Sequence, residues 1–66
     1  MGCENVEIVL ELPRPMYEEE FCHWESVNRP ENMILLKEYH PVGEEPAELW
    51  RAIYLECDPE SASMLL

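Results

Sequence analysis

The stretch NVEIVLEL, from Asn5 to Leu12, decides the fold because its apolar and polar residues alternate. In an extended chain one side would carry apolar residues and the other mainly carboxylates: Val6, Ile8, Leu10 and Leu12 against Glu7, Val9 and Glu11. A period of two residues predicts a half-buried β-strand. The following Pro13-Arg14-Pro15 predicts the end of this strand, because proline donates no hydrogen bond to a ladder.

The next segment predicts a helix from about Pro15 to Val27. Proline suits the first helical turn, and the carboxylates of Glu18–Glu20 favour the positive end of the helix dipole. Three aromatic residues recur with helical spacing and form a narrow stripe: Tyr17, Phe21 and Trp24. Pro30 predicts that the helix has ended before it.

The second half of the chain has two interpretations. A single strand is unstable without a partner, so the first strand requires further strands in the same chain. Met33–His40 and Leu49–Glu56 can supply them as an antiparallel hairpin, with Pro41–Glu48 as its loop. Alternatively, Pro46 could open a helix over residues 47–57, which would give one N-terminal strand followed by helices.

The side chains favour one register of the hairpin. It places Glu38 opposite Arg51. It also places Tyr39 opposite Trp50, and such charge and aromatic pairs contribute about 0.2–1 kcal/mol each. The neighbouring register would place Lys37 against Arg51, where like charges repel. We therefore expect the first of these registers.

Together these segments predict an α+β fold of order β-α-β-β, with an antiparallel hairpin in the second half and a short C-terminal helix capped by Asp58-Pro59. Residues 1–66 form a single small acidic domain, because a chain of about 60 residues supplies only one modest core. The helix would cover one sheet face: Val6, Ile8, Leu10, Ile34, Leu36, Ile53 and Leu55. The other face would be open: Glu7, Val9, Glu11, Leu35, Lys37, Tyr39, Trp50, Ala52, Tyr54 and Glu56.

The charge of the chain limits its partners. Fifteen acidic residues face four basic ones, and the formal net charge is -11. The resulting negative potential repels nucleic acid and anionic membranes and attracts basic proteins, over a Debye length of about 8 Å at physiological salt. We therefore expect no direct binding of nucleic acid or membrane. The plainer alternative is that the charge only keeps the protein in solution.

The cysteines indicate reduced thiols in a cytoplasmic protein. Cys3, Cys22 and Cys57 are odd in number and show no short repeated spacing, unlike the cysteines of secreted disulfide frameworks. Glutamates interrupt the start of the chain, so we expect no signal peptide. No stretch approaches the roughly 20 apolar residues that span a bilayer.

No residue pattern indicates catalysis, a cofactor or a metal site. Cys22 and His23 are adjacent on the predicted helix, so their side chains diverge by about 100° and cannot form a nucleophile and base pair. The cysteines and histidines lack the paired spacing of zinc ligands, and the glutamates lie in no calcium-binding loop. We therefore expect no enzyme activity, no cofactor and no bound metal.

These observations favour a non-catalytic acidic protein that binds the basic surface of a protein partner. The most specific version of this hypothesis is an inhibitor that occupies a nucleic-acid-binding surface of its target, with carboxylates in place of phosphates. The predicted partner-binding residues are eight glutamates and three aromatic anchors: Glu7, Glu11, Glu18, Glu19, Glu20, Glu44, Glu45 and Glu56, with Tyr39, Trp50 and Tyr54. The alternative is an obligate homodimer or a small structural subunit of a larger assembly, whose aromatic face is always covered. A third class, a metal or thiol module, would contain bound zinc. No segment resembles a known family.

Overall fold

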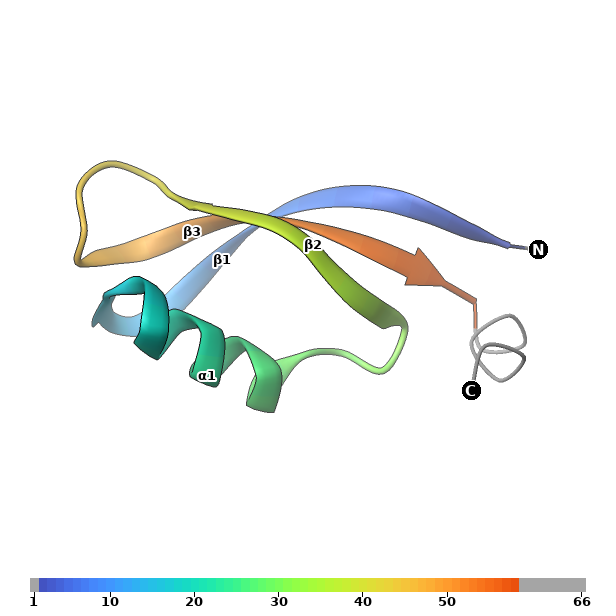
Figure 1. Cartoon of the computed structure of the whole chain (residues 1–66), viewed down its shortest axis with the longest axis horizontal. Helices are drawn as coiled ribbons and strands as arrows, with labels where there is room; N and C mark the ends of the chain where they lie inside the picture. Colours follow the sequence, from blue (N-terminus) through green and yellow to red (C-terminus); the bar gives the residue numbers. More distant parts are fainter. Residues whose placement is uncertain (1, 59–66) are drawn as a thin grey trace.

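A computed structural model describes residues 2–58 of the chain. Its elements are β1 (Cys3–Met16), α1 (Glu18–Asn28), β2 (Met33–Pro41) and β3 (Ala47–Cys57). The strands form one antiparallel sheet in the order β1-β3-β2, so β3 lies at its centre. Helix α1 runs along one side of this sheet, and no described element covers the opposite side (Figure 1).

The predicted fold class is wrong. Within residues 2–58, strands account for 60% of the residues and a single helix accounts for 19%. Strands are longer than expected because β1 continues through Pro13 and Pro15 to Met16. An edge strand tolerates proline where the missing N–H would face away from its neighbour, and the β1–β3 register shifts between Glu11 and Met16.

The helical alternative for residues 47–57 and the expected C-terminal helix have different outcomes. Residues 47–57 form β3, so the alternative of one strand followed by helices is also wrong. A short C-terminal helix was expected after Asp58, and this prediction falls outside the described residues.

The hairpin of β2 and β3 has a different register from the one expected. Near its open end Met33 lies opposite Glu56, but further along Glu38 lies opposite Ile53 and Tyr39 lies opposite Ala52. The predicted Glu38–Arg51 and Tyr39–Trp50 pairs are therefore wrong. The physical reason is two irregularities in β2, between Met33 and Leu35 and between Leu36 and Glu38, each of which adds one residue to β2 and moves the pairing by one position.

The covered face of β3 is also the reverse of the predicted one. Leu10 of β1 lies opposite Trp50, and the two share the face that meets α1. Phe21 of α1 stacks on Trp50 with ring centroids 4.4 Å apart. The buried apolar residues are Leu12, Met16, Phe21, Ala47, Trp50, Ala52, Tyr54 and Cys57. Placing Trp50 and Tyr54 inside buries more apolar surface than placing Ile53 and Leu55 there, which favours this arrangement.

Candidate partner-binding site

The start of α1 and the loop between β2 and β3 bring carboxylates together at one end of the molecule. The backbone N–H of Glu18 donates a hydrogen bond of 2.9 Å to Glu45 Oε2. A shallow depression at this place is lined by Tyr17, Glu18, Glu19, Glu20 and Glu45. We call the five carboxylates of these two segments the acidic end: Glu18, Glu19, Glu20, Glu44 and Glu45.

Most of the acidic end lacks a compensating charge. Glu20 is the exception, since its Oε2 lies 2.6 Å from Nη1 of Arg14 and its Oε1 accepts the Tyr17 backbone N–H at 3.5 Å. The hydrogen bond from Arg14 lowers the pKa of Glu20, and the bond from Tyr17 adds to this effect. Within residues 2–58, no lysine or arginine forms an ion pair with the other four carboxylates.

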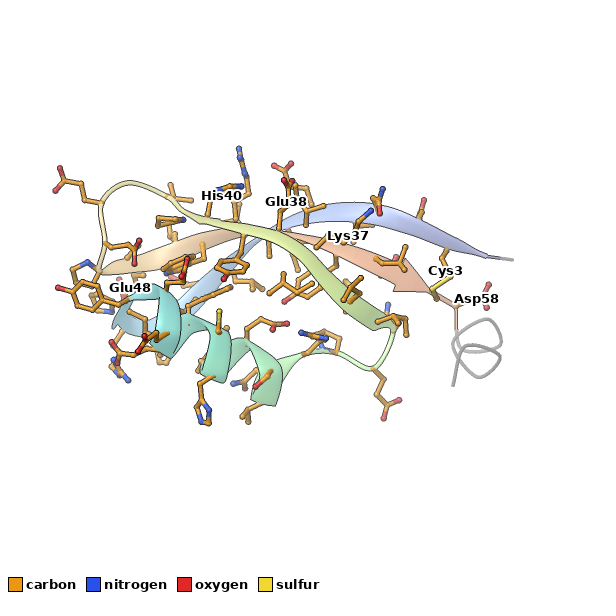
Figure 2. The ribbon with its side chains drawn as sticks, in the orientation of Figure 1. Cys3, Lys37, Glu38, His40, Glu48 and Asp58 are labelled. Carbon is orange, nitrogen blue, oxygen red and sulfur yellow. A yellow bond between two sulfur atoms is a disulfide. The ribbon has the colours of Figure 1, made fainter. Side chains whose placement is uncertain are left out.

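Glu7 and Glu11 lie elsewhere, on the sheet face opposite α1, which we call the outer face. Glu7 lies opposite Ile53 in the ladder, and its Oε2 is 3.8 Å from Nε of Arg51. Side chains of β2 project on the same side, where Figure 2 shows Glu38 and His40 pointing away from α1. The outer face therefore mixes both signs of charge, in contrast to the acidic end.

The predicted exposure of the aromatic anchors is wrong. Trp50 and Tyr54 each have an exposed fraction of 1%, and Trp50 Nε1 donates to the carbonyl of Ala47 at 2.9 Å. Tyr39 is half-buried, with its ring 5.4 Å from that of Phe21, and its interaction with Cys22 raises the pKa of Tyr39 to about 12. Side chains in these positions stabilise the fold and offer little surface to a partner.

Glu56 lies at the other end of β3. Its Oε2 accepts a hydrogen bond of 2.7 Å from Asn32 Nδ2, and the residue is half-buried. The structure thus brings Glu18, Glu19, Glu20 and Glu45 together, with Glu44 next to Glu45 in the loop, and leaves Glu7, Glu11 and Glu56 apart from them.

A buried ionic cluster was missed. Glu25 of α1 has an exposed fraction of 2%, and its carboxylate accepts hydrogen bonds of 2.7 and 2.8 Å from Arg29 and one of 2.7 Å from the Tyr54 hydroxyl. The guanidinium of Arg29 also lies 5.9 Å from the centre of the Tyr54 ring. Glu25 lies in α1 and Arg29 directly follows its last residue, Asn28, so the four-residue spacing of opposite charges in the sequence could have indicated this pair.

The same cluster has shifted pKa values. Burial by itself would raise the pKa of Glu25, but the hydrogen bonds from Arg29 and Tyr54 outweigh it and lower that pKa. Burial and the bond to Glu25 together raise the pKa of Tyr54. The hydrogen bond to Glu25 raises the pKa of Arg29. Glu25 is therefore a structural carboxylate that stays ionised inside the fold.

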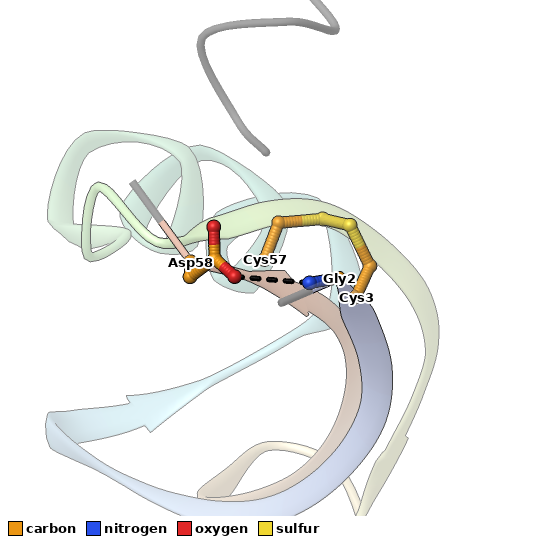
Figure 3. The surroundings of a disulfide bond; sticks show 4 residues. All are labelled: Gly2, Cys3, Cys57 and Asp58. Carbon is orange, nitrogen blue, oxygen red and sulfur yellow. Dashed lines mark hydrogen bonds between the residues drawn. A yellow bond between two sulfur atoms is a disulfide. The ribbon is translucent and has the colours of Figure 1, made fainter. Parts of the chain in front are cut away.

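A disulfide joins Cys3 and Cys57, with Cα atoms 4.1 Å apart, so the expectation of reduced thiols is wrong for these two residues. Figure 3 shows this bond beside a hydrogen bond of 2.9 Å from the Gly2 backbone N–H to Asp58 Oδ2. Cys22 is a free, half-buried thiol. The cytoplasmic location was expected from reduced cysteines, and the disulfide removes that support.

Among residues 2–58, no three of the histidine, cysteine and acidic side chains are grouped as metal ligands. No helix in the described part of the chain is long and apolar enough to cross a membrane. Comparison with protein-family models, curated proteins and solved structures gives no match to this chain.

Proposed function

We propose that this chain is a non-catalytic binding protein whose acidic end occupies a basic surface of a protein partner. The observation that carries the proposal is the gathering of Glu18, Glu19 and Glu45 around one depression, without an ion pair within residues 2–58, on a chain of net charge -11. Ionised carboxylates that face solvent repel one another, and a basic surface relieves that repulsion.

In its most specific version, the proposal is that the partner surface normally binds nucleic acid. Such a surface presents several lysines and arginines at phosphate spacing, and carboxylates can accept the same charge-assisted hydrogen bonds. The acidic end suits this role because its carboxylates come from two segments that the Glu18–Glu45 hydrogen bond ties together. Carboxylates on a helix and a loop that are tied together lose less backbone freedom on binding than carboxylates on a mobile tail.

The alternative function, a homodimer or structural subunit, now concerns a different surface. The aromatic face on which it was based lies in the core, but the outer face exposes Val9 and Leu49, and Leu35 of β2 is also exposed, with fractions of 58%, 40% and 52%. Exposed apolar residues on adjacent strands favour a covered face.

A charge reversal tests the proposal. The double variant Glu18→Lys with Glu19→Lys is expected to weaken binding to the partner by at least about tenfold, because two attractive contacts become repulsive. Affinity of the unaltered protein should fall steeply with added salt, and duplex DNA should compete. The partner is captured from a lysate of the source organism at low and high salt, and affinities are then measured with the purified pair by isothermal titration calorimetry.

The matched control is Glu31→Lys with Glu38→Lys, which changes the net charge equally but lies outside the acidic end. It is expected to change affinity by less than about threefold, through long-range charge alone. Equal losses in the two double variants would show that only net charge matters and would remove the acidic end as a site. Binding that changes neither with salt nor in either of the two double Glu→Lys variants would favour the structural-subunit function.

A further inference from the structure

Strand β1 forms an edge of the sheet. In the sheet order β1-β3-β2, and within residues 2–58, β1 pairs with β3 on one side only. An edge strand presents unpaired N–H and C=O groups that can pair with another strand.

Three backbone hydrogen bonds establish which residues of β1 face the open edge. Asp58, directly after β3, donates its N–H to the carbonyl of Gly2, directly before β1, so the even-numbered residues at this end bond between the two strands. Cys57 N–H donates instead to the Asn32 carbonyl, and Leu49 O accepts from Val42, so these two β3 residues bond toward the β2 side.

Residues in an antiparallel pair alternate between bonding to the partner and facing away from it. In β1, Cys3 lies opposite Cys57 and Glu11 lies opposite Leu49. Every second residue from Cys3 to Glu11 therefore directs its backbone N–H and C=O to the open edge: Cys3, Asn5, Glu7, Val9 and Glu11. Their neighbours at even positions bond to β3.

The two edges of the sheet are protected differently. Edge strand β2 contains two irregularities, with Lys37 within the second, and it ends at Pro41. Bulges, lysines and prolines are the usual devices that prevent a further strand from pairing. The pairing of β1 with β3 is regular from Cys3 to Glu11, and this segment contains no proline. The β1 edge therefore accepts a strand where the β2 edge resists one.

The charge of the β1 edge selects the kind of strand. Glu4, Glu7 and Glu11 are the charged residues of this segment, and all three are exposed. Glu7 and Glu11 share one face of β1, so a second β1 in a register that sets Glu7 opposite Glu7 or Glu11 would place like charges across the two strands, which is destabilising. A strand with lysine or arginine at the facing positions instead forms stabilising pairs of opposite charge with these carboxylates.

We propose that the β1 edge binds an extended basic segment of a partner protein as a fourth, antiparallel strand. Lysine or arginine of that segment lies opposite Glu7 and Glu11, and an apolar residue between them lies opposite Val9, which is 58% exposed. The recognised pattern is basic, any, apolar, any, basic, because alternate residues share a sheet face. The inference takes only the basic character of the partner from the proposed function and adds a separate contact.

The probe is a blocked peptide, Thr-Lys-Val-Val-Val-Lys-Thr, and the measurement is amide hydrogen exchange by NMR. In the free protein the N–H groups of Asn5, Glu7 and Val9 should exchange fast, because they face solvent. Saturating peptide is expected to slow them by about tenfold or more, as new ladder hydrogen bonds form. Amides at the even positions Val6 and Ile8 are already bonded to β3 and should change little.

Two controls separate ladder pairing from charge attraction. A peptide of the same sequence that carries N-methyl groups on the edge-facing amides keeps its charge and should give no alternating protection. Val9→Pro removes the outward N–H without removing a β1–β3 bond, and it should weaken peptide binding by about tenfold or more. Val9→Thr keeps that N–H and should bind like the unaltered protein. Circular dichroism checks that each variant is folded. If Val9→Pro does not fold, the N-methylated peptide alone tests whether the peptide pairs with β1 through backbone hydrogen bonds.

The outcomes distinguish the edge inference from the proposed function. Binding without alternating protection, or equal binding of the N-methylated peptide, overturns the edge inference, while the charge reversals at Glu18 and Glu19 still test the acidic end. Alternating protection together with partner binding that ignores salt supports the edge and overturns the proposed function. Protection of the same amides at high protein concentration without peptide would identify a second copy as the occupant and overturn the basic partner.

Discussion

Reduction of the Cys3–Cys57 disulfide is expected to lower the free energy of unfolding by about 4 kcal/mol. The bond joins the first residue of β1 to the last residue of β3, with a sequence separation of 54. A cross-link that closes a loop of this length removes conformational entropy from the unfolded chain worth about 4 kcal/mol. Because a domain of about 60 residues has only a few kcal/mol of stability, the reduced protein should be largely unfolded.

The measurement is urea unfolding followed by circular dichroism, with and without a reducing agent. The double variant Cys3→Ser with Cys57→Ser should reproduce the effect of the reducing agent. Cys22→Ser is the control, since Cys22 is the free thiol, and reducing agent should destabilise it as much as it destabilises the unaltered protein. A loss below about 1 kcal/mol on reduction would contradict the entropic role of the bond.

The sequence predicted the local segments better than their arrangement. The alternation from Asn5 to Leu12 lies within β1, and the helix expected to Val27 ends at Asn28. Both signals are periodicities within one segment, which a sequence displays directly. The α+β class nevertheless failed, because Pro13 and Pro15 were expected to end a strand that the sheet edge allows to continue.

The pairing of the strands could not be predicted in the same way. Two added residues in β2 shift the hairpin register, and nothing in the composition of Met33–Pro41 reveals them. The buried face of β3 depends instead on its pairing with β1. The prediction placed Leu10 on the same face as Ile53 and Leu55, but Leu10 lies opposite Trp50. Trp50 and Tyr54 were therefore expected at the surface and lie in the core.

The candidate site was predictable only in part. The run Glu18–Glu20 is visible in the sequence as exposed charge, but its approach to Glu45 depends on the path of the loop between β2 and β3. The disulfide was hidden because an odd number of cysteines gives no pairing pattern. Cys3 and Cys57 meet because β1 and β3 are neighbours in the sheet, which is a property of the topology.

Replacement of Glu25 by alanine is expected to lower the free energy of unfolding by about 3 kcal/mol. The change leaves the Tyr54 hydroxyl and the half-buried Arg29 guanidinium without their acceptor, and removing one member of a buried pair typically costs about 3–5 kcal/mol. We expect the lower part of this range because Arg29 retains an exposed fraction of 27%. Glu19→Ala, an exposed site on the same helix, should change stability by about 0.5 kcal/mol or less.

The contribution of Glu25 should also depend on pH. Its pKa in the folded protein lies below the ordinary value of 4.5, so the folded state favours the ionised carboxylate. The stabilisation is therefore fully present above pH 4.5 and is lost as the pH falls through the lowered, folded pKa. Urea unfolding of the unaltered protein and of Glu25→Gln, measured in parallel across this range, isolates the effect, because the other carboxylates contribute equally to both. The difference between the two proteins should shrink on acidification, whereas a difference independent of pH would mean that the ionised form of Glu25 is not what stabilises the cluster.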